Sequence, residues 1–160
     1  ILFFMINDLL EIINPEIIYL IANWGVIPFW LLLIFIPYHP ITNFFAQSII
    51  PLLLLAIAYA YLSFNLYLEN NILSSFELYY GLDALYSMFS SEILLLMFWI
   101  HFLSISLFAG AWIVRDSKRY LIPRIITIPS LILTYFTGPV GLIFYWFLRI
   151  LFAKKISFND

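Results

Sequence analysis

The longest uncharged stretch of the chain places the strongest limit on its fold. From residue 17 to residue 68 the sequence contains no Asp, Glu, Lys or Arg. A single helix over this stretch would be about 78 Å long, whereas the hydrocarbon core of a bilayer is only ~30 Å thick. Pro37 and Pro40 remove backbone donors and disfavour helix in the residues before them, so they predict a turn. We therefore expect two membrane spans here, over about residues 17–37 and 42–64.

Composition agrees with a membrane protein and argues against several other classes. Of the 160 residues, 65% are apolar and 10% charged, and the mean hydropathy is +1.05. Soluble domains typically contain about 45–50% apolar and about 25% charged residues. The net charge of -2 and the lack of a basic, polar surface argue against nucleic acid as a partner. Without cysteine there are no thiolate metal sites or disulfides, and two histidines are too few ligands for a di-metal centre. No metal site is therefore expected, and these observations identify no cofactor.

Two further apolar stretches, over about residues 93–114 and 123–151, complete the predicted fold. The expected architecture is an all-α integral membrane bundle of four transmembrane helices, forming a single domain over residues 1–160. Between the second and third spans, apolar residues recur at helical spacing from Phe76 to Phe89. This pattern predicts a short amphipathic segment at the membrane interface, and the first dozen residues are a second candidate for the same role.

The charges predict an orientation. All seven basic residues follow Val114, four of them within residues 115–124, whereas seven acids precede residue 93. With four spans, the basic 115–124 loop lies on one side of the membrane and both termini lie on the other. Because cytoplasmic loops are enriched in Lys and Arg, we expect this loop on the cytoplasmic, stromal or matrix side of a bacterial inner membrane or organelle membrane. Residues 115–119 are interpreted as a solvated loop with anchoring cations, or less readily as a contact for lipid headgroups or a partner.

His101 is the ionisable side chain that lies deepest in a predicted span. A titratable group at membrane depth is costly, so it is a candidate for function. Ser104 and Phe108 share its helix face. The histidine could act as an acid or base, or hold the polar end of an apolar ligand. It could equally be a neutral side chain that bonds a neighbouring helix. Both interpretations place it toward the bundle interior.

Other polar residues within the predicted spans favour helix packing over catalysis. Asn23 and Gln47 are suited to hydrogen bonds between helices. Thr134 and Thr137 precede the sequence Gly138-Pro-Val-Gly141, where proline interrupts the helical hydrogen bonds. A kink that lets helices pack at the glycines is the favoured interpretation, and a break that lines a ligand site is the alternative.

The order of these features resembles a known family, the neoxanthin-synthase-like membrane proteins of the abscisic-acid-deficient type, found in plants, algae and many bacteria. The resemblance covers nearly the whole chain. It rests on short motifs: Asn23-Trp-Gly-Val-Ile-Pro-Phe-Trp30 with Pro37, Ser75-Phe76 through Phe89, Trp99-Ile-His-Phe-Leu103, Leu107-Phe108, Trp112-Ile-Val-Arg-Asp116, Ile122-Pro123 and Gly138-Pro-Val-Gly141. It implies a membrane protein of four helices and, from the plant members, a role in turning violaxanthin into neoxanthin.

The chain departs from the family pattern at two positions. The family usually has Asp five residues after the motif histidine, where this chain has Ser106. It usually has His after the loop proline, where this chain has Arg124. If those family residues transfer protons, this chain lacks half of the groups needed for proton transfer. The resemblance therefore supports the fold more strongly than the activity.

Three function classes follow from these observations. The first is a protein that binds or converts a carotenoid or other isoprenoid lipid. His101, Ser104 and Ser106 are then the candidate catalytic residues, and the candidate ligand-binding residues are Trp30, Trp99, Phe102, Phe108 and Thr137. The second is a non-catalytic subunit of a larger photosynthetic or respiratory complex, in contact with carotenoid or chlorophyll pigments, membrane lipids and other subunits. A transporter is disfavoured, because paired charges within the spans and an inverted repeat are not seen.

Overall fold

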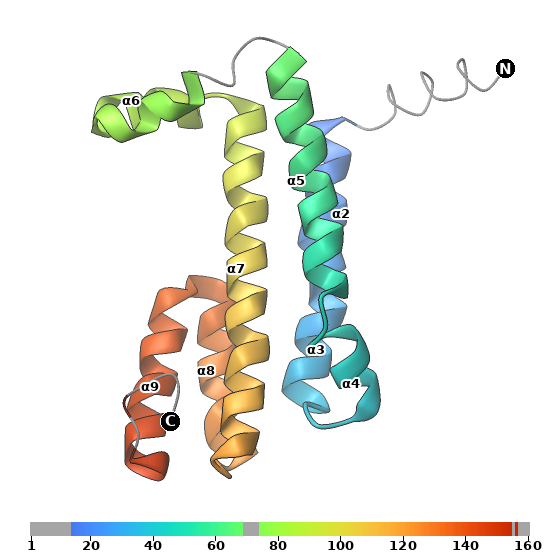
Figure 1. Ribbon diagram of the computed structural model, residues 1–160, viewed down its shortest axis with the longest axis vertical. Coiled ribbons are helices and arrows are strands. Elements are labelled where there is room, and N and C mark those ends of the chain that lie inside the picture. Colours follow the sequence, from blue (N-terminus) through green and yellow to red (C-terminus); the bar gives the residue numbers. More distant parts are fainter. Residues whose placement is uncertain (1–13, 69–73, 155, 157–160) are drawn as a thin grey trace, which may run out of the picture. The chain divides into compact units, whose positions relative to one another are not determined.

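The computed structural model describes residues 14–68, 74–154 and 156, and every regular element among them is helical. The predicted all-α class is therefore confirmed for this part of the chain. Figure 1 shows the elements, which are α2 (Pro15–Gly25), α3 (Ile27–Phe35), α4 (Pro40–Phe45), α5 (Ile50–Leu68), the 3-10 helix η1 (Ser74–Tyr80), α6 (Leu82–Phe89), α7 (Glu92–Arg119), α8 (Arg124–Thr137) and α9 (Pro139–Ala153).

The helices divide into two compact units. Unit 1 contains residues up to 25 and 55–101, and unit 2 contains residues 26–54 and those from 102 onward. The boundaries fall inside α5 and α7, so both helices contribute residues to both units. Unit 1 holds α2, η1 and α6, whereas unit 2 holds α3, α4, α8 and α9.

Within the described part of the chain, three helical segments are long and apolar enough to cross a membrane, namely 15–35, 40–68 and 92–119. The first segment consists of α2 and α3, which are joined by Val26. Pro28, in the first turn of α3, has no N–H to donate to the preceding turn. The second joins α4 to α5. Between them, the predicted turn at Pro37 and Pro40 is confirmed, because α3 ends at Phe35 and His39 caps α4 by accepting from the Ile41 N–H at 3.2 Å.

The expected solvated loop over residues 115–119 is wrong. These residues form the last turns of α7, which extends to Arg119. Asp116 and Ser117 are buried, with only 6% and 1% of their surface exposed. The local sequence is polar, but Asp116 has partners elsewhere in unit 2, and these offset the cost of burying its charge.

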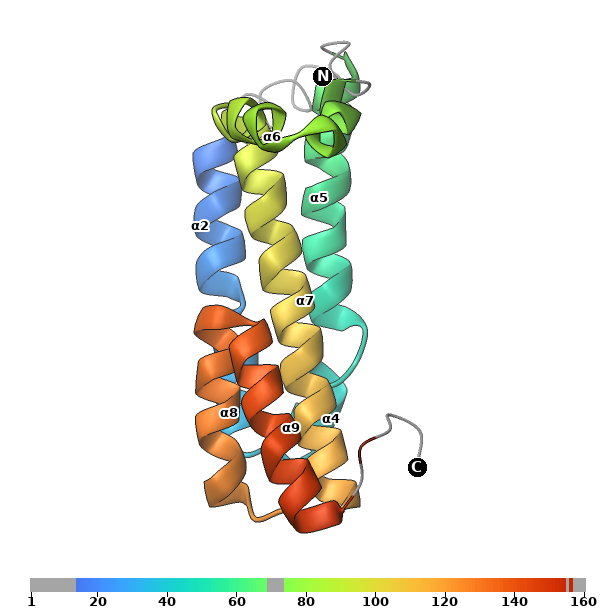
Figure 2. The same ribbon diagram turned by 90° about the vertical axis from the view of Figure 1, so that its left-hand side faces the viewer.

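The continuous fourth span expected over residues 123–151 is also wrong, because two helices occupy this region. Gly138 separates α8 from α9 with a φ of 57°, a conformation that glycine adopts without steric cost. Figures 1 and 2 show α9 running back alongside α8. At ~1.5 Å per residue, each helix is about 21–23 Å long, shorter than the ~30 Å hydrocarbon core. The Gly138-Pro139 break is thus a chain reversal rather than a kink.

Close packing at Gly141 holds the two arms of this hairpin together. A Cβ atom at Gly141 would lie 2.1 Å from the Thr134 backbone nitrogen, so no larger residue fits without a shift of the backbone. The Thr134 hydroxyl is itself buried and donates to the Ser130 carbonyl at 2.7 Å. Small residues of this kind let helices approach closely where lipid supplies no hydrophobic driving force. The expected packing at the glycines of this motif is therefore present.

Between α5 and α7, the predicted amphipathic segment contains η1 and α6. Figure 1 shows both lying crosswise at the start of α7, within unit 1. Their apolar side chains Phe76, Tyr80 and Tyr86 are strongly exposed. The location of this segment at a membrane interface remains a prediction. The first dozen residues lie outside the part of the chain that the structure describes.

Candidate functional site

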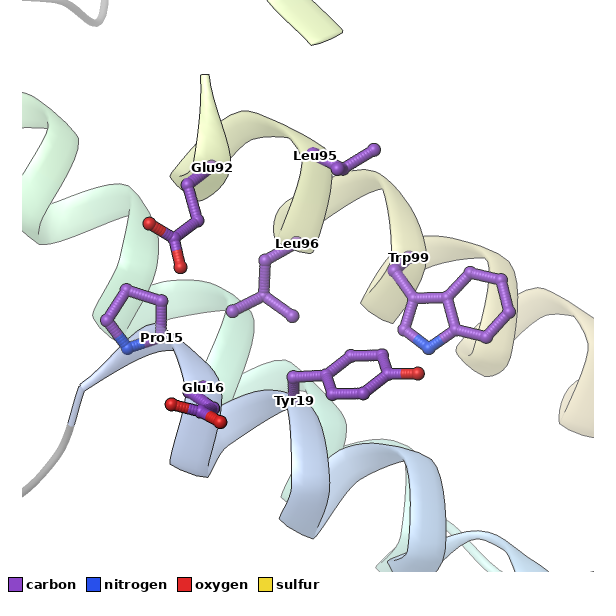
Figure 3. A pocket seen from close by; sticks show the side chains of 7 residues that line it. All are labelled: Pro15, Glu16, Tyr19, Glu92, Leu95, Leu96 and Trp99. Carbon is purple, nitrogen blue, oxygen red and sulfur yellow. The ribbon is translucent and has the colours of Figure 1, made fainter. Parts of the chain in front are cut away.

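An apolar cavity in unit 1 lies between the first turns of α2 and those of α7. Its volume is about 420 Å³. Figure 3 shows two carboxylates at one end of it and two aromatic rings at the other. The lining side chains are Pro15, Glu16, Tyr19, Glu92, Leu95, Leu96 and Trp99.

Local sequence brings the two carboxylates to the same end of the cavity. Asn14 begins α2 by accepting from the Ile17 N–H at 2.9 Å, and Glu16 lies in the first turn that follows. Glu92 is the first residue of α7. A negative charge in the first turn of a helix is favoured by the helix dipole and by backbone N–H groups that lack partners. Both carboxylates therefore lie at a helix start beside the cavity.

Aromatic and aliphatic groups form the rest of the wall. The rings of Tyr19 and Trp99 lie 6.5 Å apart between centroids at an angle of 40°. Leu96 is buried, whereas Tyr19 and Trp99 have 42% and 38% of their surface exposed. The arrangement combines an apolar wall for a hydrocarbon chain with acceptors for a hydroxyl group. It is typical of a site for an amphipathic lipid-like molecule.

The residues that the sequence suggested as one site are divided between the two units. Of that set, Trp99 alone lines the cavity with the two carboxylates. His101 is exposed, contrary to the expected interior position, and lines a second cavity in unit 1 of about 320 Å³ with Tyr59, Met88 and Met97. The other side chains that line this cavity are apolar or aromatic.

The remaining candidates lie in unit 2. Trp30 is buried, with its ring edge-on to Tyr135, and it packs where Gly110 leaves space. Phe102 and Ser106 lie against Gly138 at the hairpin turn, and Ser104 is half-buried. The exposed Thr137 hydroxyl donates to the Leu133 carbonyl at 2.7 Å, a bond within its own helix. Phe108 lines a third cavity. The roles proposed for these residues remain untested predictions.

A buried polar cluster in unit 2 was missed by the sequence reasoning. The Asp116 Oδ2 atom accepts from the Tyr145 hydroxyl at 2.7 Å and from Arg149 Nε at 2.8 Å. Arg149 is fully buried and its guanidinium lies over the rings of Tyr120 and Trp146, at 4.9 Å and 5.2 Å from their centroids. The cluster joins the end of α7 to the end of α9. The carboxylate of the cluster accepts hydrogen bonds from its hydroxyl and guanidinium groups, so the cluster acts as a structural junction.

The chain's two departures from the family pattern have structural explanations here. Arg124 donates to the carbonyls of Ile34 and Phe35, which lie at the end of α3 and have no partner within the helix. An arginine at this position therefore caps α3. Ser106 is buried at the hairpin turn, where a Cβ atom on Gly138 would lie 3.4 Å from its hydroxyl. Neither residue lines the cavity with the two carboxylates.

Comparison with known proteins identifies the family. The sequence model of the ABA DEFICIENT 4-like family matches residues 17–145. The chain belongs to this family. A curated relative from Arabidopsis thaliana, Protein ABA DEFICIENT 4, chloroplastic, is 29% identical over 129 residues. The aligned part is 79% of this chain and 57% of the relative, so the chain spans little more than half of the relative's length.

Membership in the ABA DEFICIENT 4-like family confirms the resemblance inferred from the sequence motifs. No solved structure matches the chain. The matched region includes Glu92 and Trp99, whereas Glu16 lies one residue before it. Together with three helices of membrane-spanning length and composition, the match supports a neoxanthin-synthase-like membrane protein.

Proposed function

We propose that this protein binds a hydroxylated carotenoid, or a similar hydroxylated isoprenoid lipid, in the cavity between α2 and α7. The observation that carries the proposal is the pairing of Glu16 and Glu92 at one end of an otherwise apolar cavity. Family membership supports a carotenoid as the class of ligand.

The two ends of the cavity match the two parts of such a ligand. A carboxylate accepts a hydrogen bond from a hydroxyl group, and bonds to charged acceptors are stronger than those between neutral groups. Trp99 and Tyr19 offer aromatic faces to a conjugated chain. Because Glu16 and Glu92 lie in the first turns of apolar helices, the hydroxyl would sit at the membrane surface and the chain would extend inward.

The function we propose is binding, and any conversion of the ligand would depend on the same carboxylates. Opening an epoxide ring requires a proton donor and a proton acceptor within reach of the reacting atoms. Glu16 and Glu92 are the two carboxyl groups that line the cavity. His101, which lines a different cavity, is then not part of this acid–base pair.

We further propose that the ends of α7 and α9 face the same side of the membrane, the cytoplasmic, stromal or matrix side. The Asp116–Arg149 ion pair supports this arrangement, because it joins the last turns of the two helices through a contact of 2.8 Å between the side-chain atoms Oδ2 and Nε. The α8–α9 hairpin would then enter the membrane and return without crossing it. Lys154 would then lie on the same side as the basic residues Arg115, Lys118, Arg119 and Arg124. A fourth crossing would instead place Lys154 on the opposite side, against the tendency of basic residues to gather on one side.

Binding to carotenoids of different polarity tests the main proposal. We expect the purified protein in nanodiscs to bind zeaxanthin, which carries ring hydroxyls, at least tenfold more tightly than the hydrocarbon β-carotene, measured by quenching of tryptophan fluorescence. Glu92→Gln should weaken zeaxanthin binding by about tenfold, the effect of losing one charge-assisted hydrogen bond. Glu77→Gln is the matched control, because Glu77 is an exposed acid on η1 that does not line the cavity. Equal binding of the two carotenoids would contradict the proposal.

A further inference from the structure

A groove in unit 2 has the form of a second lipid site. It lies between the start of α5, the 46–49 turn that precedes it, and one face of α7. Its volume is about 180 Å³. The residues that define it are Gln47, Leu52, Leu107, Phe108, Ala111 and Arg115.

The groove is apolar along its length and charged at one end. From Leu107 to Arg115 it follows α7 for about 12 Å, at ~1.5 Å per residue. Leu107 and Ala111 form its floor, and the exposed Phe108 forms one side. Arg115 lies one turn before the end of α7 and is exposed. The groove therefore runs from a cation near the helix end toward the apolar middle of α7.

Polar groups near Arg115 are already engaged in shaping the turn. Gln47 Nε2 donates to the Pro37 carbonyl at 2.7 Å, and the Ser48 hydroxyl donates to the Phe45 carbonyl at 3.3 Å. These bonds fix the 46–49 turn as the wall of the groove. They leave the Arg115 guanidinium as the charged group at its mouth, with a planar donor geometry that suits phosphate oxygens.

The charge balance of unit 2 favours an anionic partner. Within its described residues the unit contains six basic side chains and a single acid, Asp116. Asp116 is buried and bonded to Arg149, so it does not neutralise the exposed cations. An apolar groove that ends at an unneutralised arginine matches a molecule with one hydrocarbon chain and a phosphate at the end of it.

We propose that this groove binds an acyl chain of an anionic phospholipid, with the lipid phosphate on Arg115. The site is separate from the cavity between α2 and α7, and it does not depend on the carotenoid proposal. The lipid would fill the space between α5 and α7 near their membrane-surface ends. It would thereby stabilise unit 2 in membranes that contain acidic lipid.

Native mass spectrometry of the purified protein tests the proposal, with dioleoyl-phosphatidylglycerol and dioleoyl-phosphatidylcholine as probes. We expect one phosphatidylglycerol molecule to be retained in preference to phosphatidylcholine. Arg115→Gln should weaken this binding by about tenfold, because a charge-assisted hydrogen bond is lost. Arg119→Gln is the matched control, since it removes the same charge one turn further along α7 and outside the groove. It should change the affinity by less than about twofold.

A second variant tests the apolar part of the site. Ala111→Phe should fill the groove and weaken binding of both lipids to the same extent. Arg115→Gln should weaken phosphatidylglycerol binding more than phosphatidylcholine binding, because the choline cation already offsets the phosphate charge in the second lipid. An equal loss in Arg115→Gln and Arg119→Gln would overturn the proposal, because it would show attraction to general positive charge. Competition by free glycerol phosphate as effective as the intact lipid would also overturn it, as would a protein dimer that excludes lipid.

Discussion

Arg149 Nε donates to Asp116 Oδ2 at 2.8 Å, and this buried contact connects residues separated by 33 positions in the chain. It ties the last turns of α7 to the last turns of α9. The Tyr145 hydroxyl donates to the same carboxylate oxygen, so the acid has two donors. The position of the α8–α9 hairpin in unit 2 is therefore held by a charged junction as well as by helix packing.

Removal of one member of this ion pair should be strongly destabilising. Asp116→Asn leaves the Arg149 guanidinium buried without its counter-charge, which typically costs about 3–5 kcal/mol. We expect a clear loss of thermal stability of the purified protein, followed by circular dichroism during heating. The double variant Asp116→Leu, Arg149→Met should recover much of the loss, because it buries no charge. A double variant less stable than Asp116→Asn would contradict this explanation.

Substitution of Gly141 should open the hairpin. Gly141→Ala places a methyl group 2.1 Å from the Thr134 nitrogen and forces the two helices apart. Overpacking of this kind costs about 1–3 kcal/mol. Thermal unfolding of Gly25→Ala provides the control, because a Cβ at Gly25 meets nothing within 4 Å among the described residues. If both alanine variants melt at the same temperature, the close contact at Gly141 is not important for stability.

The hairpin also predicts which residues face the same side of the membrane. The chain has no cysteine, so single cysteines can be introduced without a background signal. Arg119→Cys and Lys154→Cys should react with a membrane-impermeant maleimide added from the same side of sealed vesicles. Glu92→Cys, at the other end of α7, should react from the opposite side. Labelling of Lys154→Cys together with Glu92→Cys would instead indicate that the hairpin crosses the membrane.

Parts of the fold could be predicted because local sequence determines them. The turn after α3 follows from Pro37 and Pro40, and the apolar runs give the three long helical segments. The hairpin could not be separated from a continuous span, since hydropathy is uninterrupted across Gly138 and a glycine-proline pair fits both a kink and a reversal. Which of the two forms depends on the contacts of Gly141 with Thr134, and these are not encoded in any local pattern.

The sites were harder to predict for a related reason. Asp116 stands among cations in the sequence and looked solvated, because its partner Arg149 is distant along the chain. Glu16 and Glu92 lie just outside the predicted spans, where they enter only the charge balance that predicts the orientation. Their position in the first turns of two apolar helices is a feature of the sequence that could have indicated a site. The sequence pattern does not show that the two helix starts line one cavity, because this depends on how the helices pack in the folded protein.

Photo-crosslinking would test the central claim most directly. A zeaxanthin analogue with a diazirine on its end ring, irradiated with the protein in nanodiscs, should label peptides that contain residues 15–19 and 92–99. Peptide mass spectrometry would locate the label, and excess zeaxanthin should suppress it. Labelling in the starts of α2 and α7 is the result we predict for a ligand held by Glu16 and Glu92. Competable labelling elsewhere, such as beside His101, with none in these segments would contradict the proposed site.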